Sequence, residues 1–147
     1  MLFKKISLAS DHAGFHLKEE LKKHFTSEHE FIDFGPNSPN SVDYPDYAHI
    51  LSQKISESKD SFGILICGSG IGMSMVANRY KDVRAALCLN EKMAQLSREH
   101  NNANVLVLGS RLISSEEAIK CLIMFFKSKF EGNRHQARLD KFNDVKM

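Results

Sequence analysis

The chain has 147 residues, about the size of one globular domain, and its 42% of apolar residues, with ten Phe, excludes a wholly disordered chain. Twenty Lys and Arg against 18 Asp and Glu leave a net charge of +2, which excludes a nucleic-acid or membrane partner attracted by overall charge alone. The longest apolar run, Cys121–Phe126, is too short to span a bilayer and no signal peptide is evident, so we expect a cytoplasmic protein.

Strand-like apolar runs alternate with helical patterns along the chain. We predict first a strand at Phe3–Ala9, a helix at Gly14–Phe25, a strand at Glu30–Phe34 and a helix at Asp46–Ser58. Next come a strand at Phe62–Cys67, a helix from Gly72, a strand at Val83–Leu89 and a helix at Glu91–His100 capped by Asn90. The chain continues with a strand at Val105–Leu108, a helix from a capping box at Ser114 and Glu117 to Phe130, and a helix at Arg134–Asp144. This order predicts an α/β fold, a three-layer αβα Rossmann-like sandwich with a five-stranded parallel sheet and a C-terminal helical arm. We expect one domain over residues 1–147, with residues 131–147 as the arm.

Ligands of such folds bind beyond the carboxyl ends of the strands, so the residues after each predicted strand are the first candidates for a site. These residues are Ser10-Asp11-His12, Cys67-Gly68-Ser69-Gly70-Ile71-Gly72, Asn90-Glu91 and Gly109-Ser110-Arg111. Polar and reactive groups therefore gather at one edge of the predicted sheet.

The run Cys67–Gly72 is the most informative of these segments. Its three glycines at alternate positions allow close approach of a ligand and leave backbone N–H groups to face an anion. A tight turn would also use glycine, but three in five residues beside a cysteine favour an anion-binding loop. A dinucleotide site is the weaker interpretation, because the spacing is G-x-G-x-G and the loop follows the third strand.

The three cysteines are odd in number and lack CxxC spacing, which argues against a disulfide framework or a zinc site. Cys88 and Cys121 lie within apolar runs, as small buried side chains do. Cys67 instead ends a strand beside the glycine loop, where exposed amides would favour a thiolate. It is therefore a candidate base or nucleophile.

Four of the seven histidines fall among charged residues and are expected at the surface: His16, His24, His29 and His49. His12 follows a strand end, and His100 ends a helix, where the dipole favours a protonated imidazole. No histidine pair has metal-ligand spacing with a third ligand, so we expect no metal site. Arg134 and Arg138 share a helix face, which suits either solvated surface or a bound phosphate.

Five groups of segments together resemble the ribose/galactose isomerase family. They are Ala9–Phe15 with Leu17-Lys18, Asp43-Tyr44-Pro45, Ile64–Gly72, Ser97–Asn101 with Asn104–Leu106 and Gly109–Arg111, and Gly132–His135 with Arg138. The resemblance covers nearly the whole chain in order. It implies a metal-free, cofactor-free aldose–ketose isomerase of the non-oxidative pentose phosphate pathway, which interconverts ribose 5-phosphate and ribulose 5-phosphate through an enediolate.

The resemblance also implies roles for individual residues. Cys67 would move the proton between C1 and C2, Ser69 would assist at the oxygens, and the amides of Gly70–Gly72 would stabilise the oxyanion. His100 would open the furanose ring, with Asp11 nearby. The other substrate contacts would come from Tyr44 and Asn101 to the sugar, from Gly68 and Ile71 of the loop, and from His12, Arg111, Arg134 and Arg138 to the phosphate.

Sites in this family lie between subunits, so Asn101, Arg134 and Arg138 would come from the partner in a homodimer or a dimer of dimers. Some members replace the cysteine with a glutamate after the loop. Here Met73 occupies that place, which leaves Cys67 as the base. Two alternatives stay open: an allose or galactose 6-phosphate isomerase of the same family, and a phosphate- or nucleotide-binding module without turnover.

Overall fold

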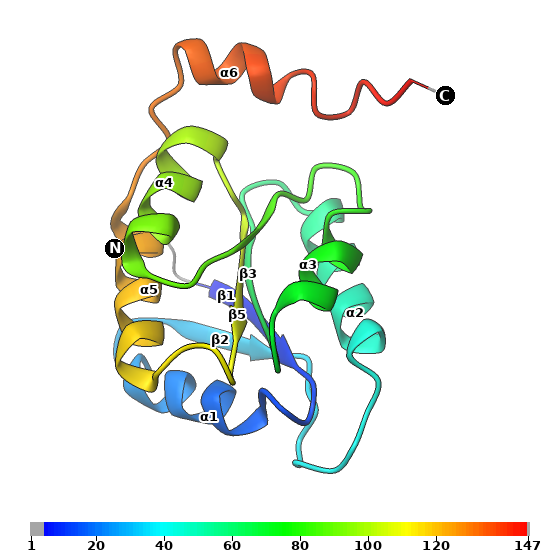
Figure 1. The fold of residues 1–147 in the computed structure, drawn as a ribbon, viewed down its shortest axis with the longest axis vertical. Helices are drawn as coiled ribbons and strands as arrows, with labels where there is room; N and C mark the ends of the chain where they lie inside the picture. Colours follow the sequence, from blue (N-terminus) through cyan, green and yellow to red (C-terminus); the bar gives the residue numbers. More distant parts are fainter. Residues whose placement is uncertain (1–4, 147) are drawn as a thin grey trace.

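Five parallel strands form the sheet in a computed structural model that describes residues 5–146 (Figure 1). In spatial order they are β2 (Glu30–Asp33), β1 (Lys5–Ser10), β3 (Phe62–Cys67), β5 (Val105–Gly109) and β4 (Ala85–Leu87). Phe3 and Lys4 of the first predicted strand lie outside the described residues. The strand order reverses between β1 and β3, which is where sheets of this kind bind their ligands.

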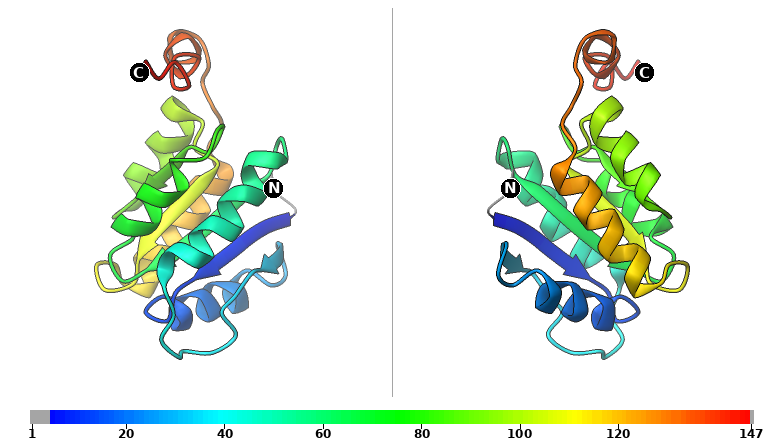
Figure 2. Two further views of the ribbon diagram at one scale, coloured as in Figure 1. Left: turned by 90° about the vertical axis from the view of Figure 1, so that its right-hand side faces the viewer. Right: turned by 90° about the vertical axis from the view of Figure 1, so that its left-hand side faces the viewer.

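Helices cover both faces of the sheet. The first face carries α1 (Phe15–His24), α4 (Glu91–Asn101) and α5 (Ser115–Lys127), and the second carries α2 (Tyr44–Glu57) and α3 (Ile71–Ala77). Figure 2 shows that α6 (Arg134–Leu139) projects from the sandwich as an arm. The predicted three-layer fold with a helical arm is confirmed. Within residues 5–146, no helix has the length and apolar character needed to cross a membrane.

The central strand β3 explains how a cysteine comes to stand at the sheet edge. All of its residues from Gly63 to Cys67 are buried. Successive side chains point to opposite faces, so Ile66 packs in the layer of α1, α4 and α5, and Cys67 in the layer of α2 and α3. A strand that is buried on both faces has no polar side, which accounts for the continuous apolar run before Cys67.

The bounds of several elements differ from the prediction, including those of β4, α5 and α6. β4 spans Ala85–Leu87 and not Val83–Leu89, because it lies at the edge of the described sheet, next to β5. α5 ends at Lys127, before Phe130, since the backbone of Ser128 is extended. α6 ends at Leu139 and only turns follow it. Phe142 is 51% exposed there, so little apolar burial would hold a further helical turn.

The predicted capping box is only half formed. Ser114 Oγ accepts the N–H of Glu117 at 3.1 Å, as expected. The Glu117 carboxylate, however, accepts the N–H of Glu91 at 3.0 Å. The side chain therefore joins the beginnings of α4 and α5 in place of closing its own cap.

The surface position expected for His29 is wrong. The residue is 6% exposed, and its ring centroid lies 4.5 Å from that of Phe126 and 5.9 Å from that of Phe25. Charged neighbours in the sequence predicted solvent, but the turn after α1 places this imidazole among aromatic rings of α1 and α5.

Candidate active site

The Cys67 thiol lies beneath the glycine loop that follows it. It is 4% exposed, and its Sγ accepts the backbone N–H of Gly70 at 3.2 Å. Ser69 Oγ accepts the N–H of Ile71, also at 3.2 Å. Two loop amides are thus engaged within the loop itself. An N–H donor directed at sulfur interacts more strongly with a thiolate than with a thiol, because hydrogen bonds to charged acceptors are the stronger ones.

Gly70 is the residue that shapes the loop. Its φ of +77° lies in the left-handed region, and a Cβ there would stand 2.5 Å from Leu87 Cδ1 and 3.1 Å from the carbonyl carbon of Leu108. Only glycine meets both conditions without strain. The tight turn that the sequence offered as one interpretation is therefore present, and it directs the Gly70 N–H toward Cys67.

Arg111 and Tyr44 reach the same loop from two other elements. A Cβ on Gly68 would lie 2.7 Å from Arg111 Nη1, and a Cβ on Gly72 would lie 2.4 Å from the Tyr44 ring. Arg111 follows β5, and Tyr44 is the first residue of α2. A guanidinium and a phenol therefore stand beside the thiol-bearing loop, as predicted from their positions after the strands or from the family resemblance.

Asp11 and His12 occupy the end of the neighbouring strand β1. Asp11 is 7% exposed, accepts the N–H of Gly14 at 3.0 Å, and donates its own N–H to Ile66 O at 3.1 Å. His12 Nδ1 lies 3.1 Å from Val42 N, from which it can accept, and 3.2 Å from Val42 O, to which it can donate. Which of the two bonds forms depends on the tautomer of the ring, and both place His12 beside the loop that carries Val42.

The other two cysteines differ from Cys67 in their surroundings. Burial raises the pKa of Cys88 to about 11 and the pKa of Cys121 to about 12. Both side chains are therefore thiols near neutral pH. They are core residues, as the sequence predicted.

His100 and Asn101 lie at the opposite edge of the sheet. They end α4, which connects two parallel strands and therefore runs antiparallel to them. Just beyond α4, Asn104 O accepts the N–H of Gly63 at the start of β3. Cys67 is four residues further along β3, and a strand rises about 3.3 Å per residue, so the two edges are about 13 Å apart.

The arm belongs to the same edge as His100. The rings of His100 and His135 stack, with centroids 4.4 Å apart and planes inclined by 16°. α6 lies at the top of Figure 1, next to the end of α4, whereas β1 ends at the bottom. The exposed Arg134 and Arg138 of α6 are thus remote from Cys67 within one chain.

Two further residues, Glu131 and His135, join His100 in a cluster that the sequence analysis missed. Glu131 Oε1 lies 3.5 Å from His135 Nε2 and 3.9 Å from His100 Nε2. Burial and the nearby charge of Arg134 hold the pKa of His135 below its ordinary value. The four-residue spacing of Glu131 and His135 indicates a pair on one turn, but the third member comes from another helix. Sequence spacing therefore gave no sign of the cluster.

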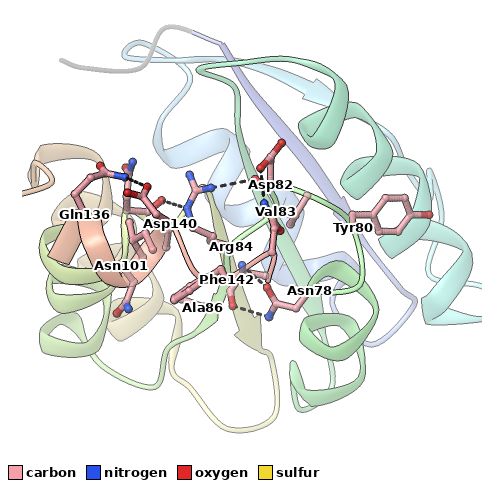
Figure 3. A pocket seen from close by; sticks show the side chains of 15 residues that line it. Asn78, Tyr80, Asp82, Val83, Arg84, Ala86, Asn101, Gln136, Asp140 and Phe142 are labelled. Carbon is pink, nitrogen blue, oxygen red and sulfur yellow. Dashed lines mark hydrogen bonds between the residues drawn. The ribbon is translucent and has the colours of Figure 1, made fainter. Parts of the chain in front are cut away.

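A cavity of about 830 Å³ lies between the arm and the body of the protein. Figure 3 shows it between Arg84 of the body and Gln136 and Asp140 of the arm. Its lining includes Asn101, but not Cys67 or the glycine loop. It is therefore a feature of the arm side and not of the thiol side.

The structure divides the predicted site residues into two groups. The thiol group comprises Asp11, His12, Tyr44, Cys67, Gly68, Ser69, Gly70, Ile71, Gly72 and Arg111. The arm group comprises His100, Asn101, Arg134 and Arg138. One chain brings together the members of each group but keeps the two groups at opposite edges.

The fold and the thiol group define a doubly wound α/β protein with a cysteine thiol beneath a glycine-rich loop at the carboxyl edge of its sheet. A family model described as Ribose/Galactose Isomerase matches residues 6–142. The chain therefore belongs to the ribose/galactose isomerase family.

Relatives in this family are similar over almost their full lengths. The chain is 47% identical over 139 residues to a probable ribose-5-phosphate isomerase B of Mycoplasma genitalium, covering 92% of this chain and 91% of the relative. It is 39% identical over 143 residues to ribose-5-phosphate isomerase B of Escherichia coli, covering 97% and 96%.

Solved structures agree with these relatives. A ribose 5-phosphate isomerase of Thermotoga maritima superposes with a TM-score of 0.93 at 50% identity, covering 97% of this chain and 99% of that one. Ribose-5-phosphate isomerase B of M. genitalium with bound ribulose-5-phosphate gives 0.90 at 46% identity, covering 93% and 92%.

Proposed function

We propose that this protein is an aldose–ketose isomerase that interconverts D-ribose 5-phosphate and D-ribulose 5-phosphate, a step of the non-oxidative pentose phosphate pathway. The observation that carries the proposal is the Cys67 thiol beneath the Gly70 N–H at the carboxyl edge of the sheet. Its support is the near full-length similarity to ribose-5-phosphate isomerase B of other organisms. The free cysteines fit the reducing cytoplasm, where we place the enzyme.

The isomerisation needs one side chain that takes a proton from C2 of the sugar and delivers it to C1. The Cys67 thiolate takes the proton from C2 of the open-chain aldose, and the C2–H electrons form the enediolate as the C1 carbonyl oxygen gains charge. The thiol then returns the proton to C1, and the O2 proton moves to O1. No electron leaves the substrate, so the reaction itself requires no redox cofactor.

Met73 supports Cys67 as the base. It stands where the family resemblance places an alternative glutamate, and it is fully buried in the core under α2 and α3. A thioether accepts no proton at neutral pH. Proton transfer in this chain therefore falls to the thiol.

Ser69 and the loop amides would stabilise charge on the substrate oxygens. The Ile71 N–H now pairs with Ser69 Oγ at 3.2 Å. A substrate oxygen bound at the loop would replace Ser69 Oγ as the acceptor of the Ile71 N–H. The amide and the serine hydroxyl could then both donate hydrogen bonds to the substrate. Donors already fixed in position are most effective where charge develops.

A second copy of the chain would complete the site. Apolar side chains flank the glycine loop with large exposed fractions: Ile71 at 46%, Met75 at 62% and Leu112 at 57%. Such a patch beside half of a site suits a subunit interface. In a homodimer, or a dimer of dimers, one copy would place the His100 of its α4 and the Arg134 and Arg138 of its arm over the thiol group of the other.

In that assembly His100 opens the furanose ring by proton transfer and Asp11 assists from the thiol side. Tyr44 and Asn101 contact the sugar hydroxyls. The phosphate dianion pairs with Arg111 and His12 of one copy and with the arm arginines of the other.

Exchange of the C2 proton with solvent tests the chemical step. We expect Cys67→Ala to abolish the exchange of deuterium at C2 of ribose 5-phosphate while leaving ligand binding intact. Cys88→Ala is the matched control, because it removes a buried thiol of the core and should leave the exchange in place. Exchange that persists in Cys67→Ala would exclude Cys67 as the base.

Subunit mixing tests the shared site. Cys67→Ala and His100→Asn should each be inactive as homodimers, but random mixing after joint refolding gives half heterodimers, each with one intact site. The mixture should therefore recover about one quarter of the wild-type activity. If the two variants stay inactive when mixed, each site is built from one chain.

Substrate choice follows from kcat/KM. We expect ribose 5-phosphate to be preferred to allose 6-phosphate and galactose 6-phosphate. A preference for a hexose phosphate would refute the proposed substrate but would still be consistent with the proposed proton transfer. Binding of sugar phosphate without turnover would instead indicate a phosphate-binding module.

A further inference from the structure

The cluster of His100, Glu131 and His135 contains a buried imidazole nitrogen that could bind a metal. His135 is 6% exposed, and its Nε2 is buried and has no hydrogen-bond partner among residues 5–146. Glu131 Oε1 lies 3.5 Å from this nitrogen and 3.9 Å from His100 Nε2. A buried imidazole nitrogen of this kind needs a partner, which is the carboxylate when the nitrogen is protonated and a hydrogen-bond donor or a metal ion when it is not.

We propose that His100, Glu131 and His135 bind a divalent transition-metal ion such as Zn²⁺, and that the bound ion removes His100 from sugar ring opening. Metal binding stands on the geometry alone, whereas the inhibitory consequence rests on the proposed function. The site would make the enzyme sensitive to free zinc without any part for metal in the reaction itself.

The donor set and its dimensions suit such an ion. Two imidazoles and one carboxylate are ligands that Zn²⁺ takes, with bonds of about 2.0–2.2 Å, so ligand atoms around a tetrahedral ion lie about 3.3–3.5 Å apart. One ligand atom from each of the three residues lies within 4.8 Å of the others. The two Glu131 distances, 3.5 and 3.9 Å, are already near the required value, and the two nitrogens lie within 4.8 Å of each other.

Closing the site requires movement of only one ring. The imidazoles are inclined by 16°, whereas convergent lone pairs need a larger angle. The His135 side chain is 7% exposed and fixed, but that of His100 is 38% exposed at the end of α4, and that of Glu131 is 44% exposed. Backbone bonds hold the frame, since Glu131 N–H donates to Glu99 O at 3.0 Å and ties the arm to α4.

The surrounding charges allow a dication with an anionic partner. Arg134 and Arg138 lie on the same arm, and their positive charges repel a cation. The negative charge of Glu131 offsets one of these two charges. Both guanidinium groups belong to exposed residues, so solvent screens their repulsion. The fourth coordination position would face solvent in one chain, or the thiol group of the partner in the proposed dimer, and would take water or an anion.

Cobalt(II) absorption of metal-free protein measures binding without reference to turnover. The titration uses the Cys67→Ala protein, so that the reactive thiol is not a competing ligand. We expect one Co²⁺ per chain with the visible bands of a tetrahedral site, displaced by Zn²⁺. Absence of these bands, or binding that is not displaced by Zn²⁺, would overturn the proposal.

Three variants in that background assign the ligands. Glu131→Gln keeps the shape of an exposed side chain and should weaken Co²⁺ binding at least about 10-fold, because even outer-shell changes have effects of that size. His135→Asn should do the same. The control is His49→Asn, which removes an exposed histidine of α2 that pairs with Tyr80, and it should leave the affinity unchanged. Equal affinity in Glu131→Gln and its parent would show that the cluster is not the site.

Inhibition is measured separately on protein with Cys67 intact. Zn²⁺ should slow turnover of ribose 5-phosphate. For each protein, the inhibitory Zn²⁺ concentration is the one that halves its own rate without metal, and this concentration should be at least about 10-fold higher in Glu131→Gln. Inhibition that is the same in Glu131→Gln would place the inhibitory ion elsewhere, for example on Cys67. Metal binding in a protein that lacks isomerase activity would refute the proposed function and not the metal site.

Discussion

The buried ion pair between Lys18 and Asp33 gives the sharpest stability prediction. Lys18 is fully buried, and its Nζ lies 2.8 and 3.0 Å from the two Asp33 carboxylate oxygens and 2.6 Å from Pro36 O. Lys22 Nζ adds a third contact to Asp33, at 2.7 Å. Asp33→Asn would keep one acceptor oxygen but leave the buried Lys18 ammonium with only the half-exposed Glu19 carboxylate, 3.7 Å away, as a counter-charge.

Breaking a buried pair from one side costs about 3–5 kcal/mol, and the remaining Pro36 carbonyl places Asp33→Asn at the lower end, about 3 kcal/mol. With a urea slope of about 2 kcal/mol/M, the midpoint of unfolding should fall by about 1.5 M at fixed protein concentration. The loop after β2 carries Val42, which holds His12, so KM for the sugar phosphate should rise as well.

The effect depends on pH in a defined direction. Burial alone would raise the pKa of Asp33, but hydrogen bonds from Lys18, Lys22 and the Gly35 N–H outweigh it and hold the pKa below its ordinary value. The carboxylate therefore contributes stability above the unfolded pKa of about 3.9, and the contribution is lost as pH falls through the lower folded value. The difference in unfolding free energy between wild type and Asp33→Asn should therefore have its full size at pH 7 and disappear in acid below about pH 4.

Two variants separate this explanation from general damage. Glu19→Gln removes an exposed carboxylate that lies 3.4 Å from Lys22 and 3.7 Å from Lys18, and it should cost under about 1 kcal/mol. Adding Lys18→Met to Asp33→Asn removes the buried charge that has lost its main partner and should restore part of the lost stability. A loss below about 1 kcal/mol for Asp33→Asn, or no recovery in the double variant, would refute the reasoning.

Three further predictions concern the site. Gly70→Ala should cost about 2 kcal/mol of folding free energy and reduce kcat. Gly132 has a φ of +69° but open space around it, so Gly132→Ala should cost about 1 kcal/mol. Equal losses of the two variants in urea unfolding would contradict the tight contact at Gly70. Arg134→Ala or Arg138→Ala should raise KM roughly 10- to 150-fold with little change in kcat, as expected for loss of a charge-assisted phosphate contact, and an unchanged KM would remove the arm from binding. At pH 7.5, iodoacetamide should modify Cys67 before Cys88 and Cys121, whose raised pKa values keep them protonated, and peptide mapping that finds either core thiol modified first would contradict this order.

Local features of the site were predictable from the sequence because they depend on neighbours along the chain. The apolar run before Cys67 marks a strand buried on both faces, and the glycines after it mark a turn with close backbone contact. The structure confirms the strand, the turn and the approach of Arg111. Asn90 likewise caps α4 as predicted, with Oδ1 accepting the Met93 N–H at 2.9 Å.

Burial of polar side chains could not be predicted in the same way. Lys18 and His29 stand among charged residues in the sequence, yet both are buried. Lys18 is accommodated because Asp33 of β2 supplies the opposite charge. His29 is accommodated because Phe126 of α5 supplies a ring face. Each partner comes from a distant segment, so only the packing of the layers shows whether it is present.

The sequence by itself determined the order of strands and helices, the thiol-bearing loop and membership of a family, because these follow from periodicity and local motifs. The tertiary structure decided which candidates meet. Parallel strands force each connecting helix to run back across the sheet, and this places Cys67 at one edge and His100 at the other. The same return path brings His100 onto Glu131 and His135 of the arm, a cluster that no spacing along the chain indicated.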